Sequence, residues 1–115
     1  MIQEGQVVLF KFPQTDKSPG KLRPALVLRK LDGFYDDWLI CMISSQLSQK
    51  IVELDEVIKK EDADFEQSGL KITSLIRISR LAVVEKNVLL GTLGSINSER
   101  LNNIKNKIAA WIKNT

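Results

Sequence analysis

The chain has 115 residues, 43% of them hydrophobic, and a formal net charge of +3, so residues 1–115 suit a single folded domain rather than a disordered chain. Neither a signal peptide nor an apolar run long enough to cross a bilayer is present, which predicts a cytoplasmic protein. The absence of histidine, together with a single cysteine, Cys41, excludes histidine-based catalytic groups and an internal disulfide.

Apolar runs in the first half of the chain predict strands. Residues 7–10 (VVLF) and 25–28 (ALVL) flank a segment rich in Pro and Gly, which predicts two strands joined by a long exposed loop. Residues 38–43 (WLICMI) are apolar on both faces and predict a central strand that packs Cys41. Residues 51–54 (IVEL) are a candidate for a fourth strand.

The second half of the chain predicts a long strand and a helix. Residues 74–84 first alternate between apolar and polar side chains and then become apolar, which predicts a strand bent into two. Residues 101–111 carry apolar side chains at helical spacing, with Asn97 or Ser98 available as the cap. Short strands followed by one terminal helix predict a mainly β fold, built as a small, strongly curved antiparallel sheet or barrel.

The four aromatic residues considered for stacking fall into two groups. Trp38 and Trp111 lie within apolar runs and are predicted core residues. Phe12 and Tyr35 flank predicted loops, where a ring can stack on a nucleic-acid base.

Charges are segregated along the chain. Residues 11–30 contain six basic side chains and one acid, whereas residues 53–66 contain seven acids and two lysines. This pattern suits a protein that offers one face to phosphates and keeps its acids on another. Solvated charge runs explain it equally well.

Several short pieces of sequence recur in a characteristic order. They are residues 5–13 (GQVVLFKFP), 23–28 (RPALVL), 42–46 (MISSQ), 69–70 (GL), 74–77 (SLIR), 80–81 (RL) and 93–94 (LG). In this order they resemble the MazF/PemK family of toxins, over nearly the whole chain. The resemblance implies the toxin component of a type II toxin–antitoxin system, with an SH3-like barrel, added helices and a homodimeric assembly.

The same resemblance implies an activity and its partners. The expected reaction is sequence-specific cleavage of single-stranded RNA by attack of the 2'-hydroxyl, without a metal or cofactor, leaving a cyclic phosphate and a 5'-hydroxyl. The expected inhibitor is a short, acidic, partly disordered antitoxin that occupies the basic groove in competition with RNA.

On the family pattern, the functional arginine is Arg23 and the functional hydroxyl is Ser44. A guanidinium offers planar donors to phosphate oxygens and stays protonated, so Arg23 suits charge stabilisation better than proton abstraction. Threonine is usual at the position of Ser44, and serine lacks the methyl group that fixes the rotamer. Gln6 and Ser79 also stand where acids are frequent in the family.

Six further residues are candidates for RNA binding: Lys17, Lys21, Ser45, Gln46, Arg77 and Arg80. Lys17 and Lys21 suit contacts to the phosphate backbone, or simply a soluble loop. Gln46 suits either a base edge or closure of a turn. Arg77 and Arg80 face either the same groove or the solvent side of their strand.

Competing interpretations remain open at this point. Arg23 is also compatible with an ion pair to the acidic segment, and the serine hydroxyls with bonds that close a turn. A gyrase-directed toxin of the CcdB type shares the barrel but cuts nothing. A catalytically silent RNA-binding module is a further alternative, because serine replaces the usual threonine at residue 44.

Overall fold

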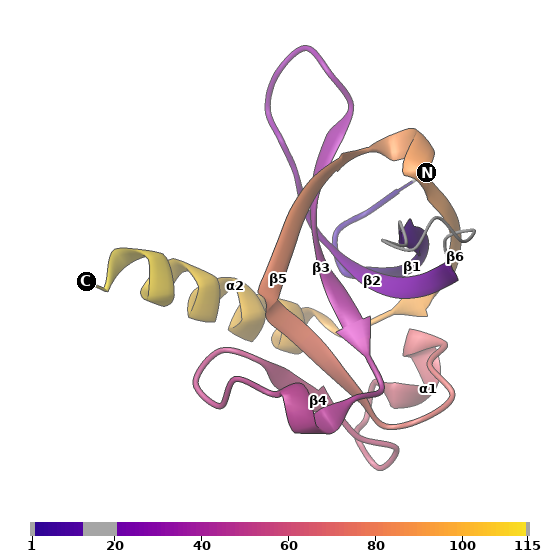
Figure 1. The fold of residues 1–115 in the computed structure, drawn as a ribbon, viewed down its shortest axis with the longest axis vertical. Helices are drawn as coiled ribbons and strands as arrows, with labels where there is room; N and C mark the ends of the chain where they lie inside the picture. The colour runs from indigo at the N-terminus through magenta and orange to yellow at the C-terminus, as the bar shows by residue number, and fades with distance from the viewer. Residues whose placement is uncertain (1, 13–20, 115) are drawn as a thin grey trace.

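A six-stranded antiparallel sheet dominates the computed structural model, which describes residues 2–12 and 21–114 (Figure 1). The strands are β1 (Gln6–Phe12), β2 (Lys21–Lys30), β3 (Asp37–Ser44), β4 (Glu56–Ile58), β5 (Ser74–Glu85) and β6 (Leu89–Ser95). The helices are α1 (Phe65–Ser68) and α2 (Ser98–Lys113), and single 3-10 turns lie at η1 (Leu47–Gln49) and η2 (Lys86–Val88). The predicted mainly β fold with a C-terminal helix is confirmed.

The sheet is strongly curved and has the strand order β4-β5-β3-β2-β1-β6. In Figure 1, β5 crosses the molecule and continues through η2 into β6, which brings the chain round to pair with β1. The expected barrel therefore takes the form of a curved sheet whose edge strands are β4 and β6. Neighbouring strands are antiparallel in all of the pairings.

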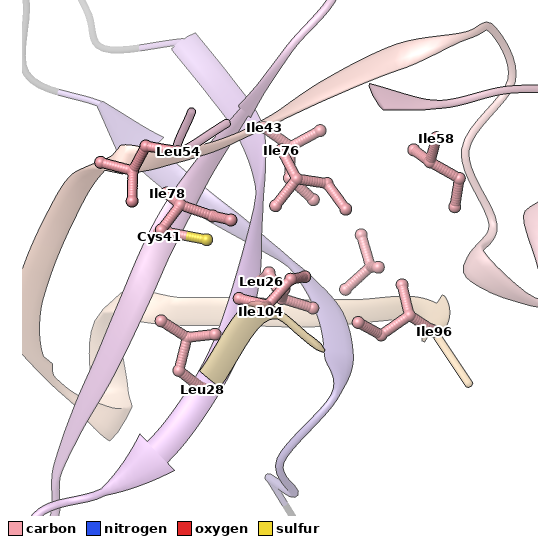
Figure 2. Packing of buried hydrophobic residues seen from close by; sticks show 11 residues of the cluster. Leu26, Leu28, Cys41, Ile43, Leu54, Ile58, Ile76, Ile78, Ile96 and Ile104 are labelled. Carbon is pink, nitrogen blue, oxygen red and sulfur yellow. The ribbon is translucent and has the colours of Figure 1, made fainter. Parts of the chain in front are cut away.

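Apolar side chains cover both faces of the central strands. In β2, Leu26 and Leu28 belong to one buried cluster, while Ala25 and Val27 belong to another. Successive strand residues point to opposite faces, so this continuous apolar run shows that both faces of the sheet are covered. The first cluster packs against α2 through Ile104 (Figure 2). The second cluster includes Trp38, whose predicted burial is confirmed.

The predicted bend in the long strand is a bulge in β5. Met42 of β3 pairs with Arg77, but the preceding residue of β3, Cys41, pairs with Leu81. Residues 78–80 therefore have no partner on β3. Asp55, which is buried, accepts hydrogen bonds from the backbone N–H of Ser79 at 2.9 Å and from its hydroxyl at 3.1 Å. This carboxylate fixes the bulge and thereby the direction in which the first half of β5 runs.

The predicted fourth strand at residues 51–54 is wrong. These residues form a turn, in which the N–H groups of Leu54 and Asp55 donate to the carbonyl of Ile51 at 3.0 and 2.8 Å. The Asp55 carboxylate also accepts from the N–H of Ile51 at 3.0 Å. A side-chain acceptor that closes its own turn competes with strand pairing, and β4 starts only at Glu56.

Two glycines let α1 approach β6. Gly69 ends α1 with φ at +76°, a left-handed conformation that favours glycine. A Cβ added there would lie 2.2 Å from the Leu93 carbonyl oxygen, and one added to Gly94 would lie 2.1 Å from that of Gln67. Two pieces of the sequence pattern, residues 69–70 and 93–94, therefore lie in close backbone contact, which glycine alone permits.

The C-terminal helix begins as predicted, with Asn97 as its cap. The Asn97 side chain accepts a hydrogen bond from the Arg100 N–H at 2.8 Å. Trp111, a predicted core residue, is 61% exposed, so that prediction is wrong. The last turns of α2 run past the sheet and are left uncovered (Figure 1). In the described part of the chain, no helix has the length and apolar character needed to cross a membrane.

Candidate active site

Strand register brings Arg23 and Ser44 to the same end of two neighbouring strands. Ala25 of β2 pairs with Met42 of β3, and Arg23 and Ser44 each lie two residues further toward that end. Residues two apart on a strand share a face, so Arg23 and Ser44 lie on the face of Ala25 and Met42, just beyond the last pair of the two strands. Arg23 lies inside β2, which starts at Lys21, ahead of the predicted strand residues 25–28.

Ser44 closes the turn after β3 and keeps a hydrogen to donate. Its Oγ accepts a hydrogen bond from the Gln46 N–H at 3.0 Å. A serine hydroxyl has one donor and two lone pairs, so this bond leaves the O–H group available to a ligand. The turn-closing role expected for the serine pair is confirmed for Ser44, and it is compatible with a second role.

Arg77 shares the face of Arg23 and Ser44, one strand further along the sheet. It pairs with Met42, which lies two residues before Ser44 in β3. Its Nη1 donates a hydrogen bond to Oε1 of Gln49 at 2.9 Å. Its Nε is buried and has no hydrogen-bond partner in the part of the chain that the structure describes. Three strands thus contribute Arg23, Ser44 and Arg77 to one face of the sheet.

The remaining candidates are distributed around this group. Lys21 is exposed, pairs with Phe12 and shares the face of Arg23. Ser45 and Gln46 are exposed in the turn after Ser44, and the Gln46 carbonyl accepts from the Gln49 N–H at 3.2 Å.

Arg80 is not brought into this group, and Lys17 is not among the described residues. Arg80 is exposed and lies in the bulge of β5, without a partner on β3. Lys17 lies outside the described residues, as does the rest of the segment 13–20.

The acidic segment is engaged with a different arginine. Arg100, near the start of α2, contacts Glu56, Asp62 and Asp64, each at 2.9 Å. Nothing singled out Arg100 in the sequence, because its partners lie 36 to 44 residues away. Among residues 2–12 and 21–114, no acid forms an ion pair with Arg23, so the alternative in which Arg23 pairs with this segment does not hold.

Hydrogen bonds and the charge of Arg100 lower the pKa values of two of these acids, Asp62 and Asp64. The pKa of Asp62 is lowered, first by the Lys59 backbone N–H and then by Arg100. Burial alone would raise the pKa of Asp64, but hydrogen bonds from Arg100 and the Asn97 N–H outweigh it and lower the value. Both acids therefore remain ionised beside Arg100. Neither neutralises the positive charges of Lys21, Arg23 and Arg77, which together are called the basic edge.

Other reactive or stacking groups lie away from this edge. Cys41 is buried in the core, and burial raises the pKa of its thiol far above the ordinary value, which leaves it a packing residue as predicted. Tyr35 pairs edge-to-face with Phe34 in the β2–β3 hairpin loop, with ring centroids 5.5 Å apart. That loop lies at the other end of β3, roughly 25 Å from Ser44 along the strand.

The side chains around Arg23 and Ser44 are suited to binding phosphate. The described residues contain no group of three or more His, Cys, Asp or Glu side chains that could hold a metal ion. Where β2 and β5 begin and β3 ends, they present the guanidinium groups of Arg23 and Arg77, the hydroxyl of Ser44 and the ammonium group of Lys21. Such donors match the oxygens of a phosphodiester and the extra negative charge of its transition state.

Comparisons with known proteins point the same way. The family model for PemK-like, MazF-like toxins of type II toxin–antitoxin systems matches residues 3–112. A solved structure of a mycobacterial endoribonuclease in complex with its cognate antitoxin matches with a TM-score of 0.67 and 13% identity, covering 100% of this chain and 98% of that one. At this identity the likeness shows the fold. The curated proteins contain no match.

Proposed function

Since the chain belongs to the family of PemK-like, MazF-like toxins of type II toxin–antitoxin systems, we propose that it is an endoribonuclease that cleaves single-stranded RNA. The observation that supports the proposal is the pairing of Ala25 with Met42, because Arg23 and Ser44 lie two residues beyond this pair and on its face of the sheet. The similarity of the fold to a mycobacterial endoribonuclease supports it. Residues 1–115 act together as one toxin domain, and the activity belongs in the cytoplasm, where messenger RNA is translated.

In the proposed reaction, the 2'-hydroxyl of the RNA attacks the adjacent phosphorus. The 2'-hydroxyl loses its proton to the solvent as its oxygen bonds to phosphorus. The bond to the 5'-oxygen of the next nucleotide breaks, and that oxygen takes up a proton from the solvent, which leaves a 2',3'-cyclic phosphate and a 5'-hydroxyl. Arg23 stabilises the negative charge that develops on the phosphoryl oxygens, because its guanidinium stays protonated. The Ser44 hydroxyl donates a hydrogen bond to one of these oxygens while its Oγ accepts a hydrogen bond from the Gln46 N–H. No step in this scheme passes through a metal or cofactor.

RNA binding is assigned to the polar residues around this pair. Lys21 and Arg77 supply positive charge on the same face, and Ser45 and Gln46 supply hydrogen-bonding groups in the adjacent turn. Arg80 is a weaker candidate, since it lies in the bulge, and Lys17, outside the described residues, remains a candidate for a contact with the RNA backbone. Sequence preference would come from bases held near the turn.

The proposed inhibitor is an antitoxin with an acidic, partly disordered segment. The basic edge has no acid paired with Arg23 among the described residues, so an acidic chain would be attracted to it and would compete with RNA. The similar mycobacterial endoribonuclease forms a complex with its cognate antitoxin. We also infer a homodimer, because Trp111 and Ile112 at the end of α2 are 61% and 65% exposed.

The decisive experiment incubates the purified protein and Arg23→Ala with a long unstructured RNA in EDTA. We expect the wild type to cut at specific sites, leaving 5'-hydroxyl and cyclic phosphate ends that can be mapped by ligation and sequencing. The loss of a charge-stabilising group should slow cleavage in Arg23→Ala by about 100-fold. Arg29→Ala is the matched control, since Arg29 is an exposed arginine at the other end of the same strand.

The other outcomes separate the competing functions. Equal cleavage rates for the wild type and Arg23→Ala would show that Arg23 takes no part in the reaction. RNA binding by the wild type without any cleavage would favour a catalytically silent RNA-binding module. A wild type that neither binds nor cuts RNA would favour a toxin that acts on a protein such as gyrase.

A further inference from the structure

The side chain of Gln49 holds Arg77 at the edge of the candidate active site. Gln49 lies in η1, the 3-10 turn after β3, and its Oε1 accepts a hydrogen bond from Nη1 of Arg77 at 2.9 Å. The two residues are 28 positions apart in the sequence. Gln49 is exposed, so this bond contributes little to the stability of the fold. Its effect is on the direction of the guanidinium.

The turn that carries Gln49 is itself fixed to Ser44. The Gln46 N–H donates to Ser44 Oγ at 3.0 Å, and the Gln49 N–H donates to the Gln46 carbonyl at 3.2 Å. The Gln49 side chain then reaches Arg77 on β5. A continuous set of hydrogen bonds therefore links the functional hydroxyl to the second arginine. Such a link fixes the relative positions of two phosphate-binding groups on different strands.

The bond to Gln49 leaves one terminal nitrogen of the Arg77 guanidinium unused. Nη1 donates to Gln49, and Nε is buried beneath the surface, so neither is open to a ligand. Nη2 is not buried and bonds to no other described residue. A charged N–H group held in one direction in this way suits an oxygen of a phosphate.

We propose that Gln49 is a positioning residue that turns Nη2 of Arg77 toward a second phosphate of the bound RNA. The first phosphate is the one between Arg23 and Ser44, so this inference rests on the proposed function. β2 and β5 lie on either side of β3, which separates the two arginines by roughly 10 Å. The RNA backbone is thereby held at two points, and the reacting phosphate is fixed in register.

The test compares Gln49→Met, Arg77→Met and the double variant. Methionine keeps the length of Gln49 but removes the strong hydrogen-bond acceptor. Ser48→Ala, in the same 3-10 turn, is the matched control. Binding is measured by fluorescence anisotropy with a labelled single-stranded 2'-O-methyl RNA of mixed sequence. This probe cannot be cleaved because its attacking hydroxyl is blocked, so binding is read independently of catalysis.

We expect Gln49→Met to weaken binding by about fivefold and to have no further effect in the Arg77→Met background. Both single variants should lower the slope of log affinity against log salt by about 0.7, the value for one lost contact to a single-strand phosphate. Cleavage of natural RNA by Gln49→Met should show a raised KM with kcat changed little. A purely structural role for Gln49 would not alter the salt dependence.

Opposite results overturn the inference in distinguishable ways. Suppose that the protein still binds and cuts RNA, but the effects of Gln49→Met and Arg77→Met are additive or the salt slope is unchanged. Such a result would reject the positioning role of Gln49 and leave the proposed function standing. A wild type that neither binds the probe nor cuts RNA would overturn the proposed function together with this inference. Arg77→Lys serves as the second background if Arg77→Met does not fold, since lysine keeps the charge without the fork.

Discussion

Ser44 carries two roles on one oxygen, and the two can be separated by mutation. Its Oγ accepts the Gln46 N–H while its hydrogen remains available to a phosphate. Ser44→Ala removes both interactions, and we expect kcat to fall by about 100-fold, as for the loss of one transition-state donor. Ser44→Thr keeps the hydroxyl and adds a methyl group that restricts its rotamers. We therefore expect Ser44→Thr to match or exceed the wild type in cleavage assays.

Ser48→Ala is again the appropriate control, because Ser48 is exposed in the adjacent 3-10 turn. Full activity in Ser44→Ala would show that the hydroxyl takes no part in the reaction. A much less active Ser44→Thr would indicate that serine is needed for the turn itself rather than for positioning of the hydroxyl.

Single residues were predictable where a sequence pattern marked them, and only there. Arg23 and Ser44 were identified by their place in the ordered family pattern, and the register of β2 and β3 sets them on one face. Arg100 escaped notice because its role depends on three acids far away in the sequence. Gln49 escaped for the same reason, since its partner lies on β5. Spacing along one element says nothing about such long-range contacts.

At the scale of elements, Arg100 fastens the start of α2 to the segment around β4 and α1. Its side chain and that of Asp64 are 12% and 1% exposed. Replacing Arg100 with methionine would leave Asp64 buried without its cation, so we expect a loss of about 3 kcal/mol in unfolding free energy. Urea unfolding at neutral pH, followed by circular dichroism, measures this change. Arg29→Met is the control, because its ion pair with Asp32 is exposed.

The same cluster predicts a loss of stability in acid. The pKa values of Asp62 and Asp64 in the folded state lie below the ordinary value of 3.8. Their contribution is therefore fully present above pH 3.8 and is lost as pH falls through the folded-state values. Asp64→Asn should be less stable than wild type at neutral pH, with a smaller further loss in acid. Parallel losses in both proteins would show that Asp64 does not contribute.

Elements were predictable from local patterns but their ends were not. The alternation of residues 74–84 predicted a bent strand, and the bulge at residues 78–80 confirms it. Residues 51–54 have the composition of a strand, yet the buried Asp55 carboxylate holds them in a turn. Helical spacing identified α2 correctly but placed Trp111 in the core, because the spacing does not tell where the sheet stops.

At the scale of the whole molecule, an apolar surface lies at the end of α2. Trp111 lines a groove with Ile51, Leu54, Ile78 and Leu81, and the next residue, Ile112, is also exposed. Exposed aromatic and aliphatic side chains on both a helix and the neighbouring sheet are typical of a surface covered by a partner. A symmetric dimer is the commonest assembly that covers such a surface.

We therefore expect Trp111→Glu to shift the protein from dimer to monomer. A charge in the centre of the buried area would have to be desolvated without a partner, whereas the exposed position leaves the folded monomer intact. Sedimentation equilibrium at several concentrations measures the change, and circular dichroism checks the fold. Phe34→Glu is the control, because Phe34 is 95% exposed in the distant hairpin loop. A wild type that sediments as a monomer, or a Trp111→Glu dimer as tight as the wild type, would show that this surface does not join two copies of the chain.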